Sequence, residues 1–108
     1  MKEEFLHYLW KYSLYDPDKL LDNEGNKIEV LNPGEYNRDA GPDFFNARLR
    51  ISGTEWAGNV EIHIRASDFD NHRHNIDPAF DNVILHVVSE NDKRVFNSKG
   101  VEVLTSGL

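Results

Sequence analysis

The sequence has no cysteine among its 108 residues, and this absence excludes several kinds of chemistry. Without thiols the chain cannot form a disulfide scaffold, bind zinc through thiolates or use a cysteine nucleophile. Long apolar runs are also lacking, since no stretch approaches the roughly 18 apolar residues of a membrane span. The acidic start, Met1-Lys2-Glu3-Glu4, has no apolar stretch typical of a signal peptide. We therefore expect a cytoplasmic protein without membrane contact.

Positive charge is in short supply as well. Twelve Lys and Arg stand against nineteen Asp and Glu, which gives a net charge of −7. Such a chain repels a phosphate backbone on average, so broad non-specific nucleic-acid binding is disfavoured. The excess carboxylates suit divalent cations, which leaves a small metal-dependent site open. A nuclease of this composition would need its arginines gathered near the site.

The apolar content is enough for one core, and we expect a single domain over residues 1–108. Hydrophobic residues make up 39% of the chain, including six Phe, four Tyr and two Trp. Residues 3–12 lack Gly and Pro and have acids in the first turn, so their periodicity predicts an amphipathic helix. The apolar stripe is Phe5, Leu9 and Tyr12, with Leu6 and Trp10 beside it.

The strongest pattern is an alternation along residues 44–51 that resumes along residues 56–65, which predicts a central hairpin. A two-residue turn at Gly53-Thr54 would make paired positions sum to 107. Ala47 then faces Val60, and the apolar residues of both strands share one side.

The remaining segments complete a prediction of fold class. Residues 27–31 predict a short strand, and the apolar run 82–88 predicts a strand covered on both faces. Residues 67–82 are polar and rich in turns, and residues 95–96 and 101–104 predict a weaker terminal hairpin. The fold class is therefore α+β, with an N-terminal helix and a mixed or antiparallel sheet of about five to six strands.

Four of the five histidines lie between residues 63 and 86, among several carboxylates. Glu61 and His63 are two apart on a strand, so they project from the same face. Such a pair could ligate a metal, or act as ligand and base. The alternative is a solvated strand face with ordinary polar residues.

A second group of candidate ligands follows the hairpin. It consists of residues spaced two apart, namely Asp68, Asp70, His72 and His74. In an extended chain all four side chains point the same way, and in a helix they would form two Asp–His pairs four residues apart. These oxygen and nitrogen donors suit zinc, manganese or iron. The alternative is an exposed acidic loop. We expect His86, within an apolar run, to be a hydrogen-bonded core residue, and His7 to be structural.

Gly41-Pro42-Asp43 opens the first hairpin strand, and Glu61-Ile62-His63 lies on its partner. This arrangement resembles the PD-(D/E)-x-K nuclease superfamily, whose core order is helix, three antiparallel strands, helix, strand. The resemblance implies a restriction-endonuclease-like fold in which Asp43 and Glu61 bind Mg²⁺ or Mn²⁺ and nucleic acid is the substrate. His63 stands where the superfamily has Lys, and the resemblance makes it the base or a further ligand.

The predicted hairpin register separates the two carboxylates of this motif. In a regular strand Asp43 would lie on the same face of the hairpin as Phe45, whereas Glu61 lies on the opposite face. The two side chains converge only if Pro42-Asp43 precedes the regular strand, or if a β-bulge changes the phase.

A second resemblance spans nearly the whole chain. The segments 37–47, 56–63 and 81–88 resemble the start of a bacterial family known only as a domain of unknown function. Members of that family are typically much longer, so the resemblance implies an N-terminal fragment or a truncated copy. The family usually has Trp where this chain has Phe69. It has no established activity and so implies no function.

Three functional hypotheses remain open. The first is a divalent-metal-dependent phosphodiesterase or nuclease that uses Asp43, Glu61 and His63. The second is a non-catalytic interaction module of a longer protein or of a homodimer, suggested by an exposed aromatic set. That set is Tyr8, Trp10, Tyr12 and Tyr15. The third is a zinc or iron hydrolase with ligands from Asp68, His72 and His74, in which Glu61 supports a ligand.

Overall fold

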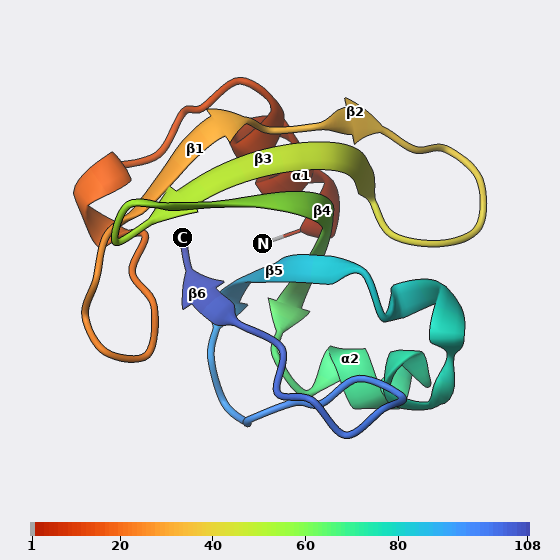
Figure 1. The fold of residues 1–108 in the computed structure, drawn as a ribbon. Coiled ribbons are helices and arrows are strands. Elements are labelled where there is room, and N and C mark those ends of the chain that lie inside the picture. The colour runs from red at the N-terminus through yellow and green to blue at the C-terminus, as the bar shows by residue number, and fades with distance from the viewer. Residues whose placement is uncertain (1) are drawn as a thin grey trace.

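The computed structural model describes residues 2–108 and shows a helix packed on a curled mixed sheet (Figure 1), which confirms the α+β class. The first half contains α1 (Glu3–Lys11), η1 (Pro17–Lys19), β1 (Ile28–Asn32), β2 (Glu35–Tyr36), β3 (Phe44–Ile51) and β4 (Thr54–Arg65). The second half contains α2 (Asp68–Asn71), η2 (His74–Ile76), η3 (Pro78–Phe80), β5 (Val83–Glu90) and β6 (Thr105–Gly107).

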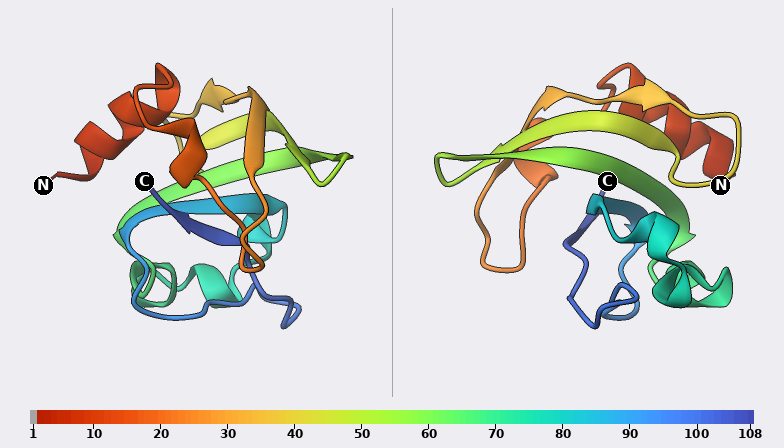
Figure 2. Two further views of the ribbon diagram at one scale, coloured as in Figure 1. Left: turned by 90° about the vertical axis from the view of Figure 1, so that its left-hand side faces the viewer. Right: turned by 45° about the vertical axis from the view of Figure 1, so that its right-hand side comes forward.

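The strand order of the sheet is β1-β3-β4-β5-β6, and β2 also pairs with β3. Neighbours are antiparallel from β1 to β4, whereas β4 pairs with β5, and β5 with β6, in parallel. Parallel pairing requires a crossover, and the segment 66–82 supplies it between β4 and β5. Figure 2 shows α1 near the β1–β3 part of the sheet and the crossover segment below β5.

The central hairpin is present, but its predicted register is wrong by two residues. Ala47 pairs with Gly58 instead of Val60. The cause is the turn, which lies at Ser52-Gly53, where φ is 49° and 80°. Two successive positive φ values are typical of the tight turns that join hairpin strands. A shift of two residues keeps each side chain on its predicted face.

A β-bulge interrupts the hairpin near its open end. Ala47 pairs with Gly58 and Phe44 with Val60, so two residues of β3 between these pairs oppose one of β4. Asn46 lies inside this irregularity with φ of 60°, in the left-handed region that Asn tolerates better than most residues. The bulge therefore reverses the phase of every β3 residue that precedes it.

This change of phase alters which residues face the core and the site. Phe44 is fully buried, whereas the predicted core residue Phe45 is only partly buried. Asp43, one residue earlier, comes into phase with Glu61 on the neighbouring strand. The bulge is thus the feature that allows the two carboxylates to approach.

Helix α1 confirms the predicted span, but its buried face differs from the predicted stripe. Leu6 and Trp10 are buried, whereas Phe5 and Tyr12 are exposed. The Trp10 Nε1–H donates a hydrogen bond to the Pro33 carbonyl oxygen at 2.9 Å, so Trp10 does not belong to an exposed aromatic set. No helix within residues 2–108 is long and apolar enough to span a membrane.

Two apolar clusters lie on opposite faces of the central strands. The larger one lies between α1 and the sheet and includes Leu6, Trp10, Leu20, Ile28, Phe44, Ala47, Leu49, Val60, Ile62, Leu85 and Val87. The smaller one lies under the crossover segment and contains Phe69, Phe80, Val83, Val95 and Val103. The middle of β4 and most of β5 are therefore buried on both faces, as predicted for residues 82–88.

The predicted terminal hairpin is wrong in its pairing. Only an isolated bridge joins Phe96 to Glu102, and the chain then adds β6 in parallel to β5. The Asn97 side chain accepts hydrogen bonds from the backbone N–H groups of Lys99 and Val101. This local turn takes up backbone donors that a longer hairpin would use.

Candidate metal centre

The middle of β4 presents polar side chains to a buried layer. Glu61 and His63 point away from the main core, toward the crossover segment, and are only 3% and 2% exposed. This burial excludes a solvated strand face. Because an unpaired buried polar group costs free energy, both side chains need partners.

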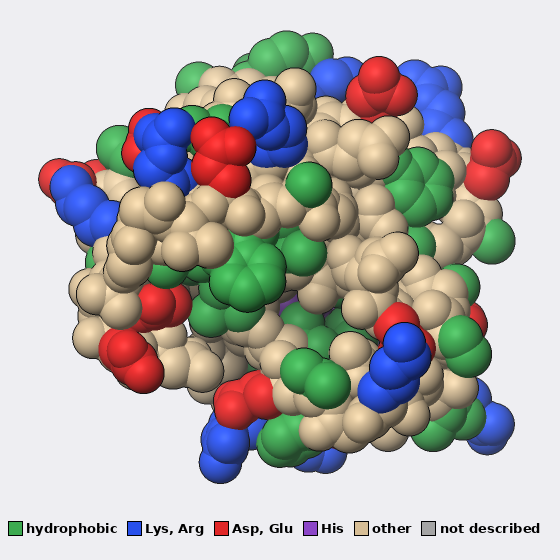
Figure 3. All heavy atoms as spheres, viewed as in Figure 1, with side chains coloured by type: hydrophobic (Ala, Val, Ile, Leu, Met, Phe, Trp, Pro, Cys, Tyr) green, Lys and Arg blue, Asp and Glu red, His purple; other side chains and the backbone are tan. Residues whose placement is uncertain are grey.

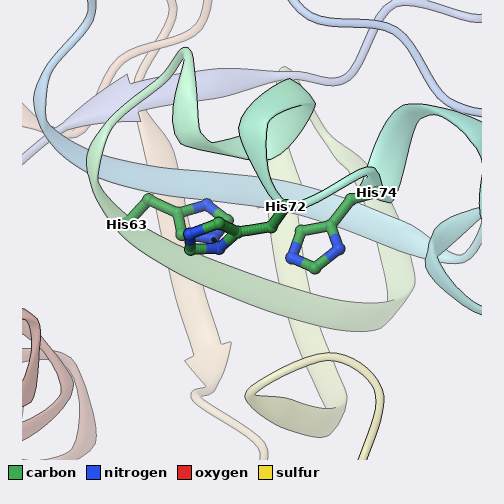
Figure 4. A group of neighbouring side chains, drawn as sticks. All are labelled: His63, His72 and His74. Atoms are coloured by element: carbon green, nitrogen blue, oxygen red, sulfur yellow. Dashed lines mark hydrogen bonds between the residues drawn. The ribbon is translucent and has the colours of Figure 1, made fainter.

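Their partners include two histidines from the crossover segment. His72 directly follows α2 and His74 begins η2, and Figure 4 shows both rings directed toward His63. Between them Arg73 adopts a left-handed conformation with φ of 63°, which turns the chain sharply. One nitrogen from each of the three histidines lies within 4.8 Å of the others.

The donor atoms of this group lie close together. His63 Nε2 lies 3.2 Å from His72 Nδ1 and 3.7 Å from Glu61 Oε2. His74 Nε2 lies 2.7 Å from the same Glu61 oxygen. Ligands of a tetrahedral zinc ion, at about 2.0–2.1 Å from the metal, are roughly 3.3 Å apart. The three nitrogens are thus candidate ligands of one ion, and Glu61 Oε2 lies beside two of them, those of His63 and His74.

Two of these histidines, His63 and His74, are in the protonation state that binds metal. Burial, followed by the neighbouring histidines, lowers the pKa of His63 to about 4. Burial also lowers the pKa of His74, with a further contribution from His72. Imidazole must be neutral to donate a lone pair to a metal, and these rings are neutral at pH 7.

His86, on β5, supports His63 from behind. Its Nε2 lies 2.8 Å from His63 Nδ1, and burial lowers its pKa to about 3. When His63 Nδ1–H donates to His86 Nε2, the lone pair on His63 Nε2 faces the other donors. Metal-binding histidines commonly use their second nitrogen in this way. The prediction that His86 is a hydrogen-bonded core residue agrees with this contact.

Asp43 contacts the other side of Glu61. The Asp43 N–H donates to Glu61 Oε1 at 3.2 Å, and the Ile62 N–H donates to Asp43 Oδ2 at 2.8 Å. The two oxygens of Glu61 therefore face different neighbours, Asp43 through Oε1 and His74 through Oε2.

The two carboxyl groups differ in charge. Burial, and then the adjacent Asp43 carboxylate, raises the pKa of Glu61 to about 10. Burial acts in the same direction on Asp43, but hydrogen bonds with His7 and Glu61 outweigh it and hold its pKa below the usual value. In the absence of a cation the pair is thus one ionised and one protonated acid.

Helix α1 adds a second group of donor atoms next to Asp43. His7 Nε2 lies 3.4 Å from Asp43 Oδ2 and 3.7 Å from Glu3 Oε1. One donor atom from each of Glu3, His7 and Asp43 lies within 4.8 Å of the others. The sequence predicts a structural role for His7 and does not mark Glu3 as a ligand. Glu3 and His7 are four residues apart, which predicts that they share one face of a helix. This spacing does not indicate that either residue contacts Asp43.

The acids of the 68–74 segment lie outside both groups. Asp68 accepts hydrogen bonds from the Arg65 N–H and the Asn71 side chain, each at 3.3 Å. Asp70 forms an ion pair with Lys93. Because α2 ends before His72, the four residues share no single periodicity. Of this segment, His74 contacts Glu61 and His72 contacts His63.

Fold and site together define a small α+β protein with a buried histidine–carboxylate cluster beside its central hairpin. The chain belongs to the family described as "Protein of unknown function (DUF2851)", whose model matches residues 3–108. No curated protein and no solved structure matches the chain. The family description assigns no activity, so function has to be argued from the geometry of the cluster.

Proposed function

We propose that this chain is a divalent-metal-dependent phosphodiesterase of the nuclease-like type, with the ion held by Glu61, His63, His72 and His74. The observation that supports this most directly is the position of Glu61. Its carboxyl group joins Asp43 to His74, so the acids of the hairpin meet the histidines of the crossover segment.

The nuclease resemblance adds to this proposal. It implies that an Asp at a strand start and a Glu on the next strand share a cation, and Asp43 and Glu61 approach each other here. With β2 and the short η elements left aside, the order α1, β1, β3, β4, α2, β5 resembles the element order of that superfamily. The donor set differs, because three imidazoles suit Zn²⁺ or Mn²⁺ better than Mg²⁺, which prefers oxygen ligands.

The residues around the ion have distinct roles in the proposed reaction. A bound divalent cation would stabilise negative charge on the phosphate and lower the pKa of a water molecule. His63 acts as a ligand, because a pKa of about 4 makes it a weak base at neutral pH. Asp43 is ionised and its Oδ2 lies 3.4 Å from His7 Nε2, so this pair can accept and hold a proton. His86 fixes the ring of His63.

Metal content and hydrolysis of bis(p-nitrophenyl) phosphate, measured together, test the proposal. We expect wild type to bind one equivalent of Zn²⁺ or Mn²⁺ at this cluster and to hydrolyse the ester. Glu61→Ala should lose the metal and lower the rate by roughly 100-fold or more, because the ion stabilises the transition-state charge. Glu55→Ala is the matched control, since Glu55 lies on the same strand but pairs with Arg48 and Arg50 at the surface. Metal binding without hydrolysis, or equal rates for the two variants, would contradict the proposal.

An interaction module is the second candidate, and a surface groove favours it. The groove has a volume of about 540 Å³, and its apolar lining includes Ile51, Trp56, Ile84, Val101 and Leu104. Trp56 and Val101 are exposed. Figure 3 shows hydrophobic side chains gathered in the middle of one face, with charged groups around the rim. The remainder of a longer protein or a second copy of the chain could cover such a groove. This candidate predicts that Glu61→Ala changes neither metal content nor hydrolysis.

A further inference from the structure

Three exposed tyrosines gather between α1 and β2. Tyr8 and Tyr12 lie one turn apart on α1, and Tyr36 lies on β2; they are 52%, 56% and 43% exposed. They line a pocket of about 290 Å³ together with Lys11 and Arg38. This volume is at the small end of ligand-binding pockets, and it suits a single flat ring system.

Two cations lie against these rings. Lys11 Nζ is 5.4 Å from the ring centroid of Tyr12 and 6.0 Å from that of Tyr36. The Arg38 guanidinium carbon is also 6.0 Å from the Tyr36 centroid. Within residues 2–108, neither Lys11 nor Arg38 has a carboxylate partner within 4.0 Å, unlike Arg48, whose guanidinium pairs with Glu55. The pocket is therefore a local basic site on a chain of net charge −7.

These charges restrict what the pocket can bind. An aromatic cage without cations would accept a quaternary ammonium group, but Lys11 and Arg38 repel such a ligand. Aromatic rings combined with unpaired cations instead favour a ligand that has both a flat ring and a negative charge. Nucleotides have this combination.

His7 connects the pocket to the candidate metal centre. Its ring forms part of the pocket wall and lies edge-on to Tyr36, with centroids 5.7 Å apart. The Nε2 of the same ring is 3.4 Å from Asp43 Oδ2. A ligand in the pocket therefore lies one side chain away from the Asp43–Glu61 pair.

We propose that this pocket binds an unpaired base and its phosphate, which makes single-stranded nucleic acid the substrate class of the metal centre. This inference rests on the proposed function. Stacking on the tyrosines requires a base that is not paired, as in a single strand. A duplex-binding surface needs many phosphate contacts, and the net charge of −7 disfavours them.

Fluorescence polarisation with fluorescein-labelled (dT)₁₂ in EDTA tests binding independently of the metal. Tyr12→Ala should weaken binding by about 5-fold to 100-fold, the range typical of a lost stacking platform. Phe5→Ala is its control, because Phe5 is an exposed aromatic residue on the same helix outside the pocket. Circular dichroism of each variant establishes that it is folded.

The charge of the pocket is tested by salt dependence. Lys11→Glu combined with Arg38→Glu should reduce the slope of log Kd against log salt by about 1.4, since each single-strand phosphate contact contributes about 0.7. Lys19→Glu combined with Lys99→Glu changes the net charge by the same amount, but at residues outside the pocket. This control should reduce the slope of log Kd against log salt by less than the pocket variant does.

The outcomes separate this inference from the proposed function. Binding of (dT)₁₂ that Tyr12→Ala weakens, without metal-dependent hydrolysis, would support the pocket and overturn the phosphodiesterase assignment. Hydrolysis of bis(p-nitrophenyl) phosphate without (dT)₁₂ binding would overturn the pocket and leave the metal centre. Binding of a 12-base-pair duplex as tight as that of (dT)₁₂ would also overturn the inference, and so would equal affinities for Tyr12→Ala and Phe5→Ala.

Discussion

Glu61 is a buried acid whose protonation state decides the charge of the whole cluster. Without a cation, Glu61 keeps its proton and the lowered pKa values of His63 and His86 keep both rings neutral. The fold thus avoids most of the free-energy cost of burying several charges. A divalent cation would replace the Glu61 proton and allow the carboxylate to act as a ligand.

These pKa shifts predict how the stability of the metal-free protein depends on pH. The pKa of Glu61 is raised from 4.5 to about 10, so stability falls as pH rises between these values. The pKa values of His63 and His86 are lowered from 6.5 to about 4 and about 3, so stability falls as pH drops below 6.5. His7, with its raised pKa, adds to the loss above pH 6.5. We expect a maximum near pH 6.5 and a decline of about 1.4 kcal/mol per pH unit per proton above it.

Urea unfolding in EDTA between pH 5 and pH 9 measures this dependence. Glu61→Gln should flatten the decline above pH 7 and steepen the decline below pH 6, because Gln does not titrate and so removes the slope that Glu61 contributes from pH 4.5 upward. Glu24→Gln, at an exposed turn, serves as control and should keep the wild-type profile. A wild-type profile that rises steadily toward pH 9 would show that Glu61 is ionised in the metal-free fold.

At the scale of elements, the sequence predicts local pattern well and long-range contact poorly. Alternation over residues 44–51 and 56–65 predicts the hairpin and the shared face of Glu61 and His63, because period 2 depends on neighbours alone. The β-bulge at Asn46 could not be predicted, because one inserted residue hardly changes the alternation of apolar and polar residues. The approach of His7 to Asp43 has no sequence signal at all, since it depends on how α1 packs against the sheet. His72 and His74 could be named as donors, but the turn that directs both toward His63 depends on the left-handed Arg73.

The bulge at Asn46 gives a prediction about one element. Asn46→Gly should keep or slightly raise stability, because Gly adopts positive φ without strain. Asn46→Val should destabilise the fold by about 1–2 kcal/mol, since a β-branched residue is strained in the left-handed region. Asn46→Val should also weaken Zn²⁺ binding, because the bulge is what brings Asp43 into phase with Glu61. Urea unfolding and Zn²⁺ titration measure the two effects.

Ser52→Val is the control that separates the effect of backbone strain on stability from the effect of the bulge on the geometry of the site. Ser52 also has positive φ, of 49°, but it lies in the hairpin turn at the opposite end of β3. This control should lose stability and keep its Zn²⁺ affinity. Equal loss of Zn²⁺ affinity in both variants would indicate that the bulge has no special role in positioning Asp43.

At the scale of the whole molecule, the cluster draws on elements that lie far apart in the chain. Glu3 and His7 come from α1, Glu61 and His63 from β4, and His86 from β5. β4 pairs with β3 only as far as Val60 and continues beyond it beside β5, which leaves one edge of Glu61 open to Asp43. Because no short segment contains the donors, the site exists only in the complete fold. Metal binding and folding should therefore be thermodynamically linked.

This linkage predicts a large thermal shift. At free Zn²⁺ of about 100 times Kd, binding stabilises the fold by about 2.7 kcal/mol, which corresponds to a Tm increase of roughly 10–20 °C for a domain of this size. His72→Ala should abolish most of the increase, and EDTA should reverse it in wild type. Asp68→Ala is the informative control, because the Asp68 carboxylate accepts hydrogen bonds from Arg65 and Asn71 and lies outside the donor groups. A shift that survives His72→Ala and disappears with Asp68→Ala would place the ion on the acidic side of α2, away from Glu61.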